Sequence, residues 1–230
     1  MAVAQKNFPD KDNLFAFATP MEFSSCFPEH ASTADSITSD KLIKLSENRG
    51  YACVLGMGIL NFATNLTYLI ASAEQQGIHF SAVYILGVCG AYPGRGINVL
   101  DVVRVDSECV GDMGYQEKDG SFYPFPSSVR ATAAEHAPAC VQKLKSAVGV
   151  TVNCCTGTEE QGLQRARMFD ADIENMEGAA GISACIAYGI PVFEVRVVCN
   201  MASTRDRISW KFNEALSALK EQVLNKMCDV

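Results

Sequence analysis

Residues 172–181 read DIENMEGAAG, and this stretch decides how the chain is interpreted. Met176 and Glu177 stand before a run of small residues that predicts a helix over 178–188, ended by Gly189. A carboxylate at the N-terminal end of a helix is stabilised as an anion. Held in apolar surroundings, Glu177 suits a ligand with two adjacent hydroxyls, such as ribose; the alternative is a simple helix cap.

Size and composition bound the class of protein. The 230 residues fit one α/β domain spanning 1–230. The net charge of −7 argues against a nucleic acid or an anionic membrane as partner, because neither tolerates an acidic protein without a basic patch. The N-terminus lacks the apolar segment of a signal peptide, and no apolar run is long enough to span a bilayer. The ten cysteines form no C-x-x-C pair and lie mostly in apolar segments, which is typical of a reduced, cytoplasmic protein.

Apolar runs that are typical of buried strands alternate with helical patterns along the chain. Strands are expected over 14–18, 51–55, 82–86, 99–105, 151–155 and 191–198. Helices are expected over 58–76, 127–147, 159–168, 178–188 and 211–226. This alternation predicts a three-layer α/β fold with a mostly parallel, twisted central sheet flanked by helices. The long irregular segment 106–128 is either a lid over the site or a packed surface excursion.

Four informative segments are expected at one edge of the sheet. In parallel sheets ligands bind outside the carboxyl ends of the strands. The segments 20–22, 87–90, 176–177 and 199–200 are all expected at that position, and 87–90 is expected as a glycine-rich turn. Their common position favours a ligand-binding role for Glu177 over a simple cap.

Several motifs are absent from the sequence. Residues 55–58 begin like a dinucleotide fingerprint, but Asn61 stands where the third glycine belongs, so a tight strand-to-helix turn is the better interpretation. The histidines, His30, His79 and His136, lie far apart and have no metal partner at helical spacing. There is no P-loop and no serine-nucleophile elbow. We therefore expect neither a cofactor nor a metal.

The sequence resembles a known superfamily. The stretches GVCGA at 87–91, NMEGAA at 175–180 and RVVCN at 196–200 resemble the nucleoside phosphorylase/nucleosidase superfamily in order and approximate spacing. The match runs from about Phe15 to Leu224. The resemblance implies a purine nucleoside as ligand and a homodimer or larger homo-oligomer.

Three further stretches are most similar to the futalosine hydrolase family within that superfamily. They are VDSECVGDMG at 105–114, TGTE at 156–159 and RDRISW at 205–210. The resemblance implies removal of hypoxanthine from futalosine, in an alternative route to menaquinone.

The resemblance also implies roles for individual residues. Glu22 matches the glutamate that activates water in nucleosidases, and burial would raise its pKa toward that of a general base. Methylthioadenosine nucleosidases usually have several acidic residues there, whereas this chain has one; the alternative is a surface glutamate after a turn. Glu177 with Met176 matches the ribose-binding pair, where a carboxylate on the 2′-hydroxyl is favoured as positive charge builds on the sugar. Cys89 and Gly90 match the segment beneath sugar and base.

Asn200 matches the position that selects the base. Members that cleave adenine usually carry Asp there, whereas an Asn amide can donate to O6 of hypoxanthine and its carbonyl can accept the proton that appears on N7. An ionised Asp would face O6 with like polarity. Asn200 therefore favours a 6-oxopurine, unless it is only a turn asparagine.

The stretch after Asn200 offers a site for a benzoate-bearing substituent at C5′ of the sugar. Trp210 or Phe212 would pack on the chain, and Arg205 or Arg207 would pair with the carboxylate. The alternative is a solvated salt-bridge cluster around these arginines.

Three rival functions remain at this point. The first is a methylthioadenosine/S-adenosylhomocysteine nucleosidase, which belongs to the same superfamily. A purine nucleoside phosphorylase would need Arg and Ser near the 87–89 turn to hold phosphate, and Ile85 and Val88 stand there instead. A non-catalytic nucleoside-binding protein would have no use for the carboxylate of Glu22.

Overall fold

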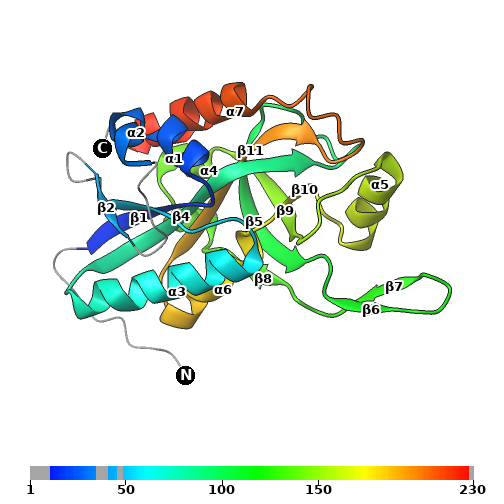
Figure 1. Ribbon diagram of the computed structural model, residues 1–230, viewed down its shortest axis with the longest axis horizontal. Coiled ribbons are helices and arrows are strands. Elements are labelled where there is room, and N and C mark those ends of the chain that lie inside the picture. Colours follow the sequence, from blue (N-terminus) through cyan, green and yellow to red (C-terminus); the bar gives the residue numbers. More distant parts are fainter. Residues whose placement is uncertain (1–10, 35–40, 46–48, 228–230) are drawn as a thin grey trace.

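A mixed β-sheet between two layers of helices organises the molecule (Figure 1). The computed structural model describes residues 11–34, 41–45 and 49–227. Within these residues the sheet has nine strands, in the order β10-β9-β5-β11-β4-β1-β3-β2, with β8 paired to β5. Their bounds are β1 Lys11–Phe17, β2 Ile43–Lys44, β3 Tyr51–Val54, β4 His79–Ala91, β5 Val102–Val110, β8 Val129–Arg130, β9 Lys145–Thr151, β10 Ile173–Asn175 and β11 Val192–Met201. The strands β6 Gly114–Gln116 and β7 Phe122–Pro124 form a separate hairpin, which projects from the body in Figure 1.

The helices cover both faces of the sheet. Their bounds are α1 Pro20–Cys26, α2 Ala31–Ala34, α3 Ile59–Gln75, α4 Ala139–Gln142, α5 Glu159–Met168, α6 Gly178–Tyr188 and α7 Phe212–Leu219. Short 3-10 turns lie at Pro28–His30 and Ala134–His136, and α7 continues through a π-helical turn, Lys220–Leu224, into α8, Asn225–Met227. In Figure 1, α1 and α7 lie on one face of the sheet, and α3 and α6 lie on the other.

Each layer of helices buries its own core. Phe17, Phe23 and Phe27 pack with Leu216 and Leu219 between the sheet and the α1/α7 layer. On the opposite face, α3 and α6 close a second core against β1, β3 and β4. Burying side chains of this size contributes roughly 1.5–3 kcal/mol each before the entropy of ordering is subtracted.

Helix α6 approaches the sheet closely because its residues are small. A Cβ atom at Gly181 would lie 2.5 Å from Cδ1 of Ile85 and 2.9 Å from Cε1 of Phe62. The helix ends at Gly189, which adopts a left-handed φ of 66°. The small-residue helix predicted over 178–188 is therefore confirmed with the same bounds.

The predicted three-layer α/β fold is confirmed, with a refinement of strand direction. Parallel pairs join β4 to β1 and β11, β1 to β3, and β9 to β5 and β10. Antiparallel pairs join β5 to β11 and β8, β10 to β4, and β2 to β3. The sheet is therefore mixed, and its long ladders, except that between β5 and β11, are parallel.

Four local predictions were wrong. The segment 87–90 is not a turn, because β4 continues through it to Ala91. The strand expected over 99–105 begins at Val102 and runs to Val110, so the segment 106–128 starts inside a strand and then forms the β6–β7 hairpin. The helix expected over 127–147 is replaced by β8, a 3-10 turn, α4 and the start of β9. The strand expected over 151–155 ends at Thr151 instead.

Candidate active site

Glu22 is fixed at the first turn of α1, directly after β1. Thr19 is the N-cap: its hydroxyl accepts from the Glu22 amide, while the Glu22 carboxylate accepts from the Thr19 amide at 3.0 Å and hydroxyl at 2.8 Å. The side chain is only 4% exposed, which excludes a surface glutamate. Burial, followed by the nearby Glu177 carboxylate, raises the pKa of Glu22 above its ordinary value of 4.5. A raised pKa makes the Glu22 carboxylate a stronger base than an ordinary glutamate.

Glu22 reaches across to β4 because Gly87 has no side chain. Oε1 of Glu22 accepts from the Val88 amide at 3.0 Å. A Cβ atom at Gly87 would lie 2.6 Å from that oxygen and 2.9 Å from Nη1 of Arg196. The glycine in 87–90 thus allows a close approach of side chains to the strand, rather than a turn.

Glu177 does not cap its helix with its side chain. Oε1 accepts from the Gly58 amide at 3.1 Å, and Oε2 forms an ion pair with Nη1 of Arg196 at 3.3 Å. Gly58 belongs to the predicted strand-to-helix turn, which is confirmed: Gly56 and Gly58 adopt φ of 87° and 89°. The amide of Gly58 in this turn donates to Glu177, so the carboxylate is held by a residue outside its own helix.

Arg196 forms ion pairs with Glu177 and Glu194, and the sequence analysis did not name it as a site residue. It lies in β11, is 1% exposed, and contacts Glu177, Glu194 and the Val88 carbonyl, with Nη1 3.4 Å from the last. The available signal was the pair Glu194 and Arg196, two charged residues with the same alternation in an otherwise apolar strand. Such residues are rarely buried unless they are paired.

Asn175 supplies the cap that Glu177 does not. Its Oδ1 accepts from the amides of Glu177 at 2.9 Å and Gly178 at 2.7 Å. The same oxygen lies 3.3 Å from Nη2 of Arg196. The sequence analysis quoted Asn175 in its motif without giving it a role, although Asn is a strong helix N-terminal signal.

Asn200 lies inside β11, not in a turn. The register with β4 slips between Val198 and Asn200, so Cys199 is the extra residue of a β-bulge. The Asn200 amide donates to the Met201 carbonyl at 2.8 Å, and the Cys199 thiol donates to its Oδ1 at 3.1 Å. A Cβ atom at Gly90 would lie 3.3 Å from Nδ2 of Asn200, so these two residues, each predicted for the site on its own, lie close together.

The remaining predicted contacts lie around this centre. Cys89 is buried in β4, and its carbonyl accepts a 3.5 Å hydrogen bond from the Cys199 thiol. Gly90 pairs with Glu174 of β10, two residues before the half-buried Met176. The segment predicted beneath sugar and base therefore lies on β4, and the predicted ribose-binding residue Met176 directly follows the neighbouring strand β10.

The segment after Asn200 places one of its two arginines on an aromatic ring. The Arg205 guanidinium carbon lies 5.3 Å from the Trp210 ring centroid, and Trp210 lies 5.6 Å from Phe212. In the described part of the chain, neither Arg205 nor Arg207 forms an ion pair with Asp206. A salt-bridge cluster is thus not formed, and Arg205 is the arginine with a defined position.

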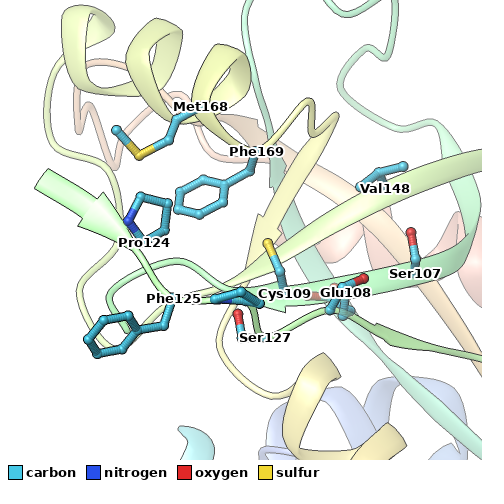
Figure 2. Close-up of a pocket in the computed structure, with 11 residues that line it drawn as sticks. Ser107, Glu108, Cys109, Pro124, Phe125, Ser127, Val148, Met168 and Phe169 are labelled. Atoms are coloured by element: carbon cyan, nitrogen blue, oxygen red, sulfur yellow. The ribbon is translucent and has the colours of Figure 1, made fainter. Parts of the chain in front are cut away.

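A pocket of about 330 Å³ lies between the hairpin and the end of α5. Figure 2 shows Met168 and Phe169 pointing toward Pro124 of the hairpin, with Cys109 and Glu108 on β5. Its lining residues are Ser107–Cys109, Pro124–Ser128, Val148, Met168 and Phe169. None of them was predicted as a site residue, although Glu108 accepts a hydrogen bond from Asn175.

Comparison with known proteins identifies the family. The phosphorylase superfamily model matches residues 41–226. The chain is 37% identical to the futalosine hydrolase of Thermus thermophilus, over 73% of this chain and 76% of that protein. It is 31% identical to the futalosine hydrolase of Streptomyces coelicolor, over 73% and 74%.

Solved structures share the fold at lower identity. The Neisseria meningitidis 5′-methylthioadenosine/S-adenosylhomocysteine nucleosidase, in complex with methylthio-immucillin-A, matches with a TM-score of 0.71 at 17% identity, covering 96% of this chain and all of that one. A futalosine hydrolase mutant of Helicobacter pylori matches with a TM-score of 0.68 at 14% identity, covering 94% and 100%.

Proposed function

Because this chain belongs to the phosphorylase superfamily, and within it to the futalosine hydrolase family, we propose that it hydrolyses the N-ribosidic bond of futalosine and releases hypoxanthine. The observation that carries the proposal is the buried cluster of Glu22, Glu177 and Arg196 next to β4 and β11. The reaction consumes one water and yields the free base and a ribose with a hydroxyl at C1′.

Glu22 activates the water in this proposal. Oε2 accepts from two donors of Thr19, whereas Oε1 has the Val88 amide as its one donor within the described part of the chain. A carboxylate oxygen accepts more than one hydrogen bond, so Oε1 retains room for a water. The raised pKa of Glu22 makes it basic enough to take the proton as the water attacks C1′.

Glu177 binds the ribose hydroxyls. Cleavage of the N-ribosidic bond builds positive charge on the sugar, so a fixed carboxylate on the 2′-hydroxyl stabilises the transition state more than the ground state. The contacts from Gly58 and Arg196 keep this carboxylate in place. Cys89 and Gly90 on the neighbouring strand β4, and Met176 beside Glu177, are the other proposed contacts of the nucleoside.

Water rather than phosphate is the proposed nucleophile. Ile85 is fully buried in the core, and the Val88 amide is already bonded to Glu22. Arg196 is paired with Glu177 and Glu194, so its guanidinium is not free for a dianion. A phosphorylase would need an unpaired cation here.

One assay separates this activity from its rivals. The protein is incubated with futalosine, inosine and methylthioadenosine, each with and without phosphate, and the products are identified by mass spectrometry. We expect hypoxanthine from futalosine at a rate that phosphate does not change. A phosphate requirement with formation of ribose 1-phosphate esters would indicate a phosphorylase, and adenine as the main product would indicate the methylthioadenosine enzyme. Binding without any turnover would indicate a binding protein.

Asn200→Asp is expected to lower kcat/KM for 6-oxopurine nucleosides by about 10- to 100-fold, because an acceptor replaces the donor that faces O6. The new carboxylate would also face the Met201 carbonyl that the amide now binds at 2.8 Å. Steady-state kinetics with futalosine and methylthioadenosine measure the change in preference. Faster cleavage of methylthioadenosine than of any 6-oxopurine by the parent protein would contradict this role.

Arg205→Ala is expected to raise KM for futalosine by about 10- to 100-fold, with a much smaller effect on inosine, which lacks the carboxylate. Stacking on Trp210 holds the Arg205 guanidinium, while Phe212 extends the apolar surface for the substituent at C5′. Arg207→Ala is the matched control, because Arg207 is an exposed arginine of the same loop. If both variants keep the parent KM, the carboxylate is bound elsewhere or futalosine is not the substrate.

The remaining proposals concern the setting of the enzyme. We place it in the cytoplasm, in a route to menaquinone, and as a homodimer or larger homo-oligomer. Tyr115 and Tyr123 of the hairpin stack at 5.3 Å and are each about half exposed, beside the half-exposed Phe125, which supports an interface there. Light scattering measures the assembly. Among the described residues, no helix is long and apolar enough to cross a membrane.

A further inference from the structure

Glu194 is a fully buried carboxylate that the proposed reaction does not use. Its side chain is 0% exposed, and Oε1 accepts from Nε of Arg196 at 2.8 Å. Oε2 is buried and has no hydrogen-bond partner among the described residues. A buried carboxylate oxygen without a donor costs free energy unless a proton or a second polar group satisfies it.

A second buried carboxylate, Glu108, lies beside it. Glu108 is 1% exposed and accepts from the Thr151 hydroxyl at 2.8 Å and from Nδ2 of Asn175 at 2.5 Å. A Cβ atom at Gly178 would lie 2.5 Å and 2.6 Å from the two oxygens of Glu194 and 2.7 Å from Oε1 of Glu108. Both carboxylates therefore converge on the same point above Gly178.

The space around the pair is formed by glycine. A Cβ atom at Gly149 of β9 would overlap the Glu108 carboxylate, as one at Gly178 would overlap both groups. Among the described residues, Arg196 is the one cation that forms an ion pair with either member. Two carboxylates this close, with a single counter-charge already shared with Glu177, cannot both be ionised.

We propose that Glu108 and Glu194 share one proton and act as a singly charged positioning pair for the ribose-binding carboxylate. Glu194 orients Arg196, which holds Glu177 by its side chain. Glu108 orients Asn175, which holds Glu177 by its amide. The shared proton occupies the position where Oε2 of Glu194 lacks a donor. The positioning role rests on the proposed function, whereas the sharing of the proton does not.

The surroundings of Glu108 and Glu194 favour a state in which the pair holds one proton. Burial is the main cause that raises the pKa of Glu108 and of Glu194, and Glu194 raises that of Glu108 further. Among the described residues, the charged groups that face the pair are Arg196 and Glu177. The Tyr92 hydroxyl and the Cys109 thiol also face Glu108, and burial raises the pKa of both, so they stay neutral. The Cys89 thiol also faces the pair, and burial raises the pKa of that thiol, so it stays neutral.

Kinetics of single and double glutamine variants test the shared charge. Glutamine mimics a protonated carboxyl group, so Glu108→Gln or Glu194→Gln leaves one carboxylate and the same charge. We expect each single variant to keep kcat within about threefold, and the double variant to lose about 100-fold, because Arg196 then loses this counter-charge. A double variant that loses only the product of the single effects would overturn the proposal, as would a single variant that loses as much as the double.

The pH dependence separates positioning from mere packing. In the double variant the charge of Arg196 is less compensated, and Arg196 lowers the pKa of Glu22. We expect the acid limb of the kcat/KM profile to move to lower pH in the double variant and to stay in place in both single variants. Loss of activity in the double variant without this displacement would contradict a role through Arg196.

Infrared spectroscopy tests the proton without any substrate. Glu22→Gln removes Glu22, the other carboxyl group whose pKa is raised among the described residues. In this background we expect the infrared band of a protonated carboxyl group at neutral pH. The band should vanish when Glu194→Gln or Glu108→Gln is added, because the remaining carboxylate is then ionised. Absence of the band, or its persistence in both combined variants, would refute the shared proton. If the band behaves as expected but futalosine is not cleaved, only the proposed function fails.

Discussion

Glu22→Gln is expected to lower kcat for futalosine by a factor of about 10² to 10⁴, the usual effect of removing a positioned acid–base group. The amide keeps the size of the side chain but cannot take a proton from water. KM should change less than about tenfold, since Glu22 does not hold the nucleoside. Single-turnover release of hypoxanthine measures the chemical step directly.

The matched control is Glu74→Gln, which makes the same change on the exposed face of α3 and should leave kcat as it is. Near-normal turnover in Glu22→Gln would remove Glu22 from the mechanism. Thermal unfolding of both variants shows whether a loss of activity reflects a loss of folded protein.

The stability of the Glu22→Gln variant has a predictable sign. The pKa of Glu22 is raised in the folded state, so the folded protein binds this proton more tightly than the unfolded chain. Its contribution is therefore fully present below the unfolded pKa and is lost as pH rises through the folded pKa. The variant lacks this loss, so its melting temperature should fall less than that of the parent as the pH rises above the ordinary glutamate value of 4.5.

Local sequence patterns predicted the helices well where the helical pattern was unbroken along the whole segment. The helices at 159–168 and 178–188 agree with α5 and α6 at both ends. The helix expected over 127–147 failed because Pro138 cannot continue a helix and restricts the residue before it. The end of that segment instead joins β9, which is paired on both sides by β5 and β10. Such pairing between distant segments overrides local propensity.

The same contrast separates the parts of the site. Glu22, Glu177 and Asn200 were predicted because each was expected at the carboxyl ends of the strands, and the structure brings all three to neighbouring elements. Their roles in catalysis stay predictions. Arg196 was missed because the role of a charged residue in an apolar strand can be inferred only when the residues that it contacts are known. Gly87 was taken for a turn, since the sequence does not show that the side chain of Glu22 passes over it.

Glu177→Gln is expected to lower kcat/KM for futalosine by about 10²- to 10³-fold, because the carboxylate that opposes the developing charge on the sugar becomes neutral. Arg196 keeps its 2.8 Å contact with Glu194 in this variant, so it is not left without a counter-charge. The melting temperature should therefore change little compared with the activity. Steady-state kinetics and thermal unfolding on the same preparation measure both quantities.

A 2′-deoxy substrate distinguishes a ribose contact from a general electrostatic effect. If Glu177 acts through the 2′-hydroxyl, kcat/KM of the parent should be about 100-fold higher for inosine than for 2′-deoxyinosine. Glu177→Gln should then reduce this preference to a few-fold. If Glu177 acts only through its charge, the variant loses activity on both substrates by the same factor and the preference is unchanged. Efficient cleavage of 2′-deoxyinosine by the parent would also exclude the hydroxyl contact. The carboxylate is held by Gly58 and Arg196 from outside its own helix, and this arrangement leaves its remaining lone pairs for the sugar.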